Sequence, residues 1–184
     1  METFIPAKVF ASNPHFGVQR RRALAELDIG TIDAPIVGLV EGFRRLPYCF
    51  TLQSCFGHFL FPGQGNPTNA DALPALPEGT RVEYRIAYIA VCLQDSPSGR
   101  GLHDNLNDLV SIDEAYIQFG CAEWFWQRQV NSYVLQVEPE RFKEQDRAEF
   151  GYQEALRVEA VRNAFFAELG RVIADCVRET QTGI

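Results

Sequence analysis

Apolar residues recur at three- and four-residue spacing in two long segments, and this spacing predicts amphipathic helices. The first segment begins after Asp33 and ends before Pro47. The second covers about 141–179, is clearest from Tyr152 onward, and from there would extend over roughly 40 Å. The apolar stripe of this second helix comprises Leu156, Val161, Phe165, Leu169, Val172, Ile173 and Cys176. The charged residues between them, Arg162 included, are expected mostly outside the stripe.

Four other segments are rich in β-branched and aromatic residues, which favour strands. They are residues 48–61, 82–93, 115–120 and 132–137. Shorter helical patterns cover about 13–28 and a segment with Leu102, Leu106 and Leu109, whereas residues 121–130 fit either a helix or a strand.

A segment that breaks regular structure separates the first two predicted strands. Residues 62–80 contain four prolines and three glycines, which interrupt both helical and strand hydrogen bonding. Long ordered loops are uncommon and often cover a site. A lid over the residues around Cys55 is therefore one interpretation, and a tolerated surface excursion is the other.

Helical and strand patterns alternate along the whole chain with no repeat and no composition shift that would mark a domain boundary. At 184 residues the chain is long enough for one full core and short for two. The prediction is a single α/β or α+β domain over residues 1–184. It has a mixed sheet of about four to six strands, helices packed on that sheet and a long C-terminal helix.

The charge balance narrows the class of partner. A formal net charge of -7 argues against nucleic acid as a partner, because affinity for it comes largely from phosphate neutralisation. The one basic run ends in Arg20, Arg21 and Arg22, and a solvated helix face is its ordinary interpretation. A local RNA-binding patch formed by these residues with Arg44 and Arg45 is the competing hypothesis.

The cellular compartment of the protein is predicted from the length of its apolar runs and from its cysteines. No apolar run reaches the ~20 residues that span a bilayer, so no membrane partner is expected. The N-terminus lacks the pattern of a secretion signal. The five cysteines are odd in number and without a Cys-x-x-Cys pair, as in proteins of reducing compartments. A cytoplasmic protein with mostly buried thiols is therefore expected.

The best candidate site lies within residues 48–61. Gly57 interrupts the apolar run where a bulge or sharp bend would fall. In an unbroken strand Thr51 and Cys55 share one face and Ser54 occupies the other. His58 would point away from Cys55, and a bend at Gly57 would bring the two together.

A cysteine and a histidine in contact support two kinds of chemistry. The imidazole can activate a thiolate nucleophile, with Cys55 and His58 as catalytic residues. The same pair can supply two soft metal ligands. Further ligands at Cys49, Cys92, Cys121 or His103 are distant in sequence and without zinc-type spacing, so no metal site is predicted.

A second candidate is an anion site after residues 82–93. The predicted loop 95–101 leads from a strand into a helix, whose free amides can bind an anion. Arg100 would add positive charge. Gly-x-Gly alone is a weak signal, and the fuller dinucleotide and phosphate-loop patterns do not occur.

The opening third of the chain resembles the tRNA wybutosine-synthesizing methyltransferase family. A basic helix and an Asp33-initiated helix precede a segment in which Thr51, Ser54, Cys55 and Gly57 match a signature of approximately Thr-Thr-Ser-Ser-Cys-Ser-Gly-Arg. Those enzymes methylate a tricyclic guanosine derivative in tRNA with S-adenosylmethionine. The resemblance implies a small-ligand pocket near residues 51–58, with S-adenosylmethionine as the cofactor and Thr51, Ser54 and Gly57 as ligand-binding residues.

A non-enzymatic, oligomeric protein is the alternative. Residues 124–126 are Trp-Phe-Trp, and such clusters occur in cores and subunit interfaces. Together with the C-terminal helix they would form a homo-oligomer interface.

Overall fold

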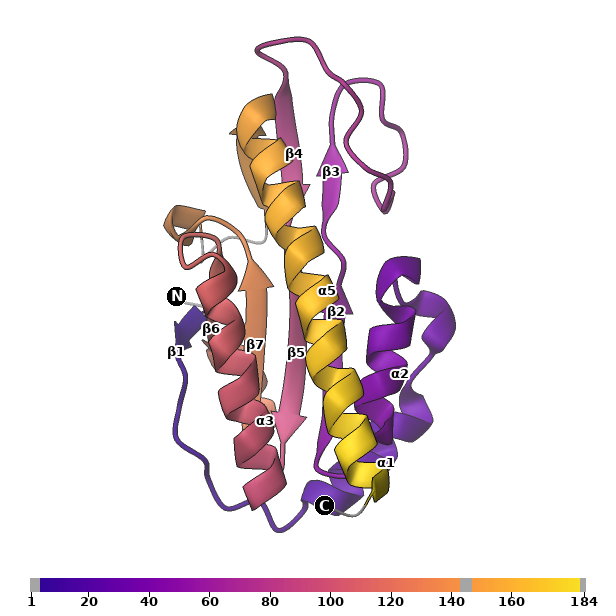
Figure 1. Cartoon of the computed structure of the whole chain (residues 1–184), viewed down its shortest axis with the longest axis vertical. Helices are drawn as coiled ribbons and strands as arrows, with labels where there is room; N and C mark the ends of the chain where they lie inside the picture. The colour runs from indigo at the N-terminus through magenta and orange to yellow at the C-terminus, as the bar shows by residue number, and fades with distance from the viewer. Residues whose placement is uncertain (1–3, 143–146, 183–184) are drawn as a thin grey trace.

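Two antiparallel sheets form the framework of the molecule. The computed structural model describes residues 4–142 and 147–182 (Figure 1). The larger sheet has the order β1-β6-β7-β5-β2 and the smaller the order β3-β4-β8. The larger sheet contains β1 (Phe4–Pro6), β2 (Cys49–Cys55), β5 (Ala87–Leu93), β6 (Ile117–Ala122) and β7 (Ser132–Val137). The smaller contains β3 (His58–Leu60), β4 (Arg81–Arg85) and β8 (Arg147–Gly151).

The predicted fold class is confirmed in its α+β form. The five strands of the larger sheet lie within the predicted range, although every pairing in the described residues is antiparallel rather than mixed. The helices are α1 (Phe16–Glu26), α2 (Val37–Arg45), α3 (Pro97–Asp108), α4 (Glu123–Arg128) and α5 (Tyr152–Thr182). Among the described helices, none combines the length and apolar character needed to cross a membrane.

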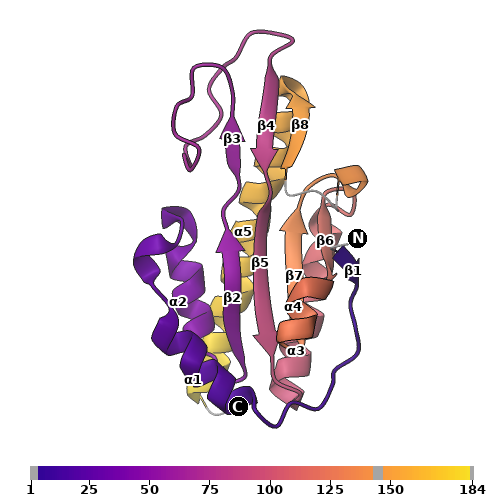
Figure 2. The same ribbon diagram turned by 180° about the vertical axis from the view of Figure 1, so that it is seen from behind.

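Helix α5 is the largest contributor to the core. It runs past both sheets, beside α3 on the same face (Figure 1). Its predicted stripe is largely buried, including Phe165, Leu169 and Ile173. On the other face, Phe16 of α1 packs with Phe50 and Cys92 (Figure 2).

The two sheets meet where two extended segments of the chain are interrupted side by side. One is interrupted between β2 and β3, and the other between β4 and β5. β2 pairs with β5 as far as Cys55 opposite Tyr88, and β3 pairs with β4 from His58 opposite Arg85. β3 therefore continues the direction of β2, and β5 that of β4 (Figures 1 and 2). The strand predicted over 82–93 is two strands, interrupted at Ile86.

Two other sequence expectations are corrected. The tail was expected to be helical from about 141, but residues 147–151 form β8, which pairs along β4; residues 143–146 lie outside the described part. The predicted loop 95–101 is mostly helix, because α3 begins at Pro97 with the Ser96 hydroxyl accepting a hydrogen bond from the Gly99 amide. β8 was not predicted because a strand of five residues has too few alternating positions to be distinguished from a helical pattern.

Candidate functional site

Gly57 makes the predicted bend, between β2 and β3. Its φ is +88°, a left-handed conformation that glycine adopts at no steric cost. A Cβ there would lie 2.8 Å from the Cβ of Ala87 and 3.0 Å from the Tyr84 hydroxyl. Conformation and close packing both require glycine, so the sequence-based prediction of a bend is confirmed.

The bend brings Cys55 and His58 together with a third residue, Asp33. One ligand atom from each of the three side chains lies within 4.8 Å of those from the other two. Nε2 of His58 is 3.3 Å from Oδ2 of Asp33. The predicted convergence of the cysteine and histidine is thus present in the fold.

Asp33 was expected only as a helix start. It precedes the short 3₁₀ turn Ala34–Ile36 that leads into α2, but its side chain makes no capping hydrogen bond. Instead Oδ2 accepts a hydrogen bond of 2.7 Å from the amide of Phe56. This contact spans 23 residues and carries no local sequence signal.

His58 is buried, and the Pro/Gly-rich loop packs against it. Its Nδ1 donates to the carbonyl oxygen of Asn69 at 3.2 Å, since a carbonyl oxygen can only accept. The loop is held further along, where the amide of Leu73 donates to Glu159 of α5 at 2.8 Å. The loop 62–80 therefore contacts the site through Asn69, as the lid interpretation requires; opening of the loop stays a prediction.

The surroundings of Cys55 favour its neutral thiol. Burial, with the charge of Asp33 and a hydrogen bond to it, raises the pKa of Cys55 to about 11. The Gly57 amide, 3.4 Å from Sγ, and the charge of Arg85 act in the opposite direction but are outweighed. This environment opposes the activated thiolate that the Cys–His pair suggests.

A β-bulge in β2 changes which motif residues share a face. The register shifts between Thr51 and Gln53, so that Thr51 pairs with Val91 and Ser54 with Ile89. Directly opposed residues point to the same face, and Val91 and Ile89 are two positions apart. Thr51 and Ser54 therefore share one face and Cys55 has the other, which corrects the alternation expected for a regular strand.

Two arginines flank the bend. Arg162 of α5, expected outside the stripe, is 2% exposed and donates from Nη1 to the Gly57 carbonyl oxygen at 2.9 Å. Its guanidinium lies 4.1 Å from the ring centre of Phe56, and burial lowers its pKa. Arg85, the register partner of His58, has a buried Nε without a hydrogen-bond partner in the described residues, while Oε1 of Glu83 lies 3.8 Å away.

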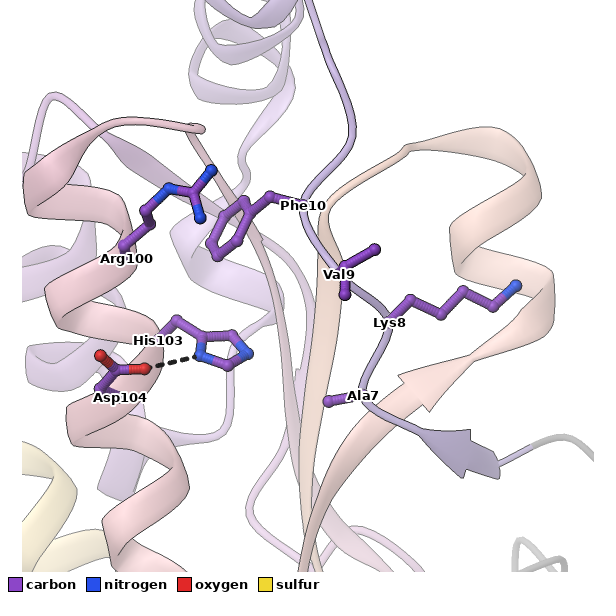
Figure 3. A pocket seen from close by; sticks show the side chains of 7 residues that line it. All are labelled: Ala7, Lys8, Val9, Phe10, Arg100, His103 and Asp104. Atoms are coloured by element: carbon purple, nitrogen blue, oxygen red, sulfur yellow. Dashed lines mark hydrogen bonds and ion pairs between the residues drawn. The ribbon is translucent and has the colours of Figure 1, made fainter.

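Arg100 does not join this site. It lies in α3, pairs with Asp95 at 2.5 Å and stands over the ring of Phe10 at 5.0 Å. It lines a separate hollow of about 340 Å³ between α3 and the segment after β1 (Figure 3). The other lining residues are Ala7, Lys8, Val9, His103 and Asp104. The predicted loop amides belong to the first turn of α3, so Arg100 adds charge to this hollow rather than to the bend.

One arginine of the basic run, Arg20, makes hydrogen bonds that connect parts of the fold. Arg20 donates three hydrogen bonds, to the carbonyl oxygens of Arg44, Leu46 and Cys49, at 2.8–2.9 Å. It ties α1 to the end of α2, where carbonyl groups lack helical partners. Arg22 pairs with Glu26.

The comparisons with known proteins give distant similarity only. No protein-family model matches the chain, and no curated protein matches it. A structure of the PH1069 protein from Pyrococcus horikoshii is similar at 16% identity and TM-score 0.47, over 88% of this chain and 96% of that one. Another, of PH1069 from Pyrococcus horikoshii OT3, has 14% identity and TM-score 0.44 over 92% and 95%. Both similarities are too distant to carry an argument.

Proposed function

We propose that the protein binds S-adenosylmethionine, or a small molecule of the same kind, at the bend between β2 and β3 and acts as a methyltransferase. The observation that carries the proposal is the convergence of Cys55 and His58 with Asp33 around Gly57. This occurs in the segment whose Thr51, Ser54, Cys55 and Gly57 resemble the methyltransferase signature.

The residues around the bend fit such a ligand. The Nε of Arg85 makes no hydrogen bond within the described residues, and the nearest carboxylate, that of Glu83, is 3.8 Å away; a guanidinium in this position is suited to a carboxylate, which is the anionic group of S-adenosylmethionine. Thr51 and Ser54 are half-buried and share the face of β2 opposite to that of Cys55, so under this proposal a ligand that contacts their hydroxyls would reach around the edge strand at the bend. When bound, the cofactor supplies an activated methyl group. The net charge of -7 favours a small-molecule acceptor over an extended nucleic acid.

Calorimetric titration of the full chain with S-adenosylmethionine tests this proposal. We expect saturable binding that weakens by at least about tenfold when Arg85→Gln removes the charge-assisted hydrogen bond. Arg100→Gln is the matched control, because that arginine lies in the other hollow, and it should bind as the wild type does. Absence of binding in the wild type, or loss in Arg100→Gln alone, would contradict the proposal.

An oligomeric, non-enzymatic protein is the second candidate. The observation favouring it is Trp124 of α4, which is 53% exposed and lies under the guanidinium of Arg128 at 4.1 Å. The buried stripe of α5 packs on the molecule's own core, so the interface would use α4 alone. Light scattering at high concentration tests it: a shift from dimer to monomer in Trp124→Ser would support it, and a wild-type monomer would oppose it.

The proposed location is the cytoplasm. Its support is that all five cysteines are free thiols, as is usual in a reducing compartment.

A further inference from the structure

The three side chains at the bend combine the donor types of a zinc site. Asp33 offers a carboxylate oxygen, Cys55 a sulfur and His58 a ring nitrogen, all within 4.8 Å of one another. Two ligand atoms each about 2.0 Å from a tetrahedral zinc ion are about 3.3 Å apart. The separation of Asp33 Oδ2 from His58 Nε2 is 3.3 Å, so these two atoms already have the spacing of a shared ion.

Both ring nitrogens of His58 face oxygen atoms, an arrangement that a proton or metal ion would stabilise. Nδ1 faces the carbonyl oxygen of Asn69 at 3.2 Å and Nε2 faces the carboxylate of Asp33 at 3.3 Å. A neutral imidazole has one N–H, and Nδ1–H is used on the carbonyl. The lone pair of Nε2 then points at an anionic oxygen, which is unfavourable unless a proton or metal ion lies between them.

The outer contacts are those that orient metal ligands. A ligating histidine usually donates its other ring N–H to a carbonyl or carboxylate, and Asn69 supplies that acceptor. The Phe56 amide fixes the carboxylate of Asp33 at 2.7 Å, and the Gly57 amide lies 3.4 Å from the sulfur of Cys55. All three candidate ligands are therefore held by backbone groups.

We propose that Asp33, Cys55 and His58 bind a divalent metal ion, with zinc as the best match to this mixture of oxygen, sulfur and nitrogen donors. The three ligands leave a fourth position for water or a polar group of a substrate, which is the pattern of catalytic rather than structural zinc sites. Asp33 and Cys55 are half-buried, whereas His58 is buried, so the cluster is partly accessible from solvent. This inference does not depend on the methyltransferase proposal.

Titration of the chelator-treated full chain with zinc and with cobalt tests the proposal. We expect one zinc per chain, and a thiolate-to-cobalt charge-transfer band that reports bonding to sulfur, because a bound ion displaces to solvent the proton that the Cys55 thiol keeps in the metal-free protein. Asp33→Asn, Cys55→Ser and His58→Gln should each lower the zinc affinity at least about tenfold. Asp33→Asn is the mildest change because the amide oxygen can still accept from Phe56. Circular dichroism without metal establishes that each variant is folded.

The control is His103→Gln, since His103 also lies beside an aspartate, Asp104, at 3.1 Å but is not part of the cluster. It should bind zinc as the wild type does. Lack of stoichiometric zinc in the wild type would overturn the proposal and leave a contact between Asp33 and His58 without a metal ion. Binding unaffected by the three cluster variants, or a cobalt complex without the sulfur band, would also overturn it. Titration with S-adenosylmethionine in the presence of chelator keeps failure here separate from failure of the proposed function.

Discussion

The carbonyl oxygen of Gly57 accepts a hydrogen bond of 2.9 Å from Nη1 of Arg162. This bond fastens the bend between the two sheets to the long C-terminal helix, 105 residues away in the chain. The bend in turn sets the positions of Cys55 and His58. The candidate site is therefore supported by a buried charge on α5 that is not one of its ligands.

Gly57→Ala should destabilise the protein strongly. The new side chain needs a positive φ and meets Ala87 and Tyr84 at 2.8–3.0 Å, and the two effects together cost about 2–4 kcal/mol of unfolding free energy. Gly63→Ala is the matched control, because its φ is +89° and a Cβ there meets nothing within 4 Å. Gly63→Ala reports the cost of the positive φ alone, whereas Gly57→Ala adds the steric clash, and urea unfolding of both variants measures the difference. Equal losses of unfolding free energy in the two variants would contradict the packing argument.

Arg162→Met should lower the free energy of unfolding by about 2–4 kcal/mol. The change leaves the buried Gly57 carbonyl without its donor and removes the cation from the ring of Phe56. The comparison variant is Arg171→Met on the same helix, whose exposed arginine pairs with Glu168 and should matter little. Thermal unfolding that ranks the two variants equally would refute a special role for Arg162.

Arg20→Met should cost about 1–3 kcal/mol, since three backbone carbonyl groups lose a shared donor. Arg22→Met, two positions along the same helix, removes only an exposed ion pair with Glu26 and should leave stability nearly unchanged. Chemical unfolding of this pair shows whether the basic run is structural at Arg20. If Arg20→Met has the unfolding free energy of the wild type, the basic run is better interpreted as a solvated helix face.

Stability should decline in alkaline solution because of buried thiols. Burial raises the pKa of Cys92 to about 12, whereas in the unfolded chain the thiol ionises near about 8.5. The folded state thus resists an ionisation that the unfolded state undergoes. The contribution of Cys92 is complete below pH of about 8.5 and is lost as the pH rises toward 12.

The measurement is urea unfolding under reducing conditions at about pH 8 and about pH 10. The wild type should lose about 1–2 kcal/mol more than Cys92→Ala between the two values. The absolute stability of the variant also falls, through its cavity, but that loss is nearly independent of pH. Identical pH dependence in the two proteins would show that Cys92 is not protected from ionisation.

Local patterns predicted the elements well where periodicity was long or unbroken. The strand at 132–137 has the predicted limits, and α5 begins at Tyr152. β8 was missed because its five residues were read as part of a charged helix, and the break at Ile86 because both halves favour strand. In each case the deciding contact is with a distant strand, β4 or β7.

The site was predicted only in its local part. Gly57, Cys55 and His58 lie within four residues, so a bend between them is visible in the sequence. Asp33 and Arg162 reach the bend from distant elements, and an aspartate before Ala-Pro or an arginine within a helix looks like an ordinary surface residue. The burial of Arg162 depends on the packing of α5, which residue types alone do not specify.

The most direct test of the central claim, that the bend unites Asp33 and His58 in one site, is a double-mutant cycle in chelator-containing buffer. Unfolding free energies of the wild type, Asp33→Asn, His58→Gln and the double variant are compared. Contact between the two side chains at 3.3 Å predicts a coupling energy of about 1 kcal/mol or more. Additive losses would show that the two residues do not meet in solution, and would contradict both proposals for the bend.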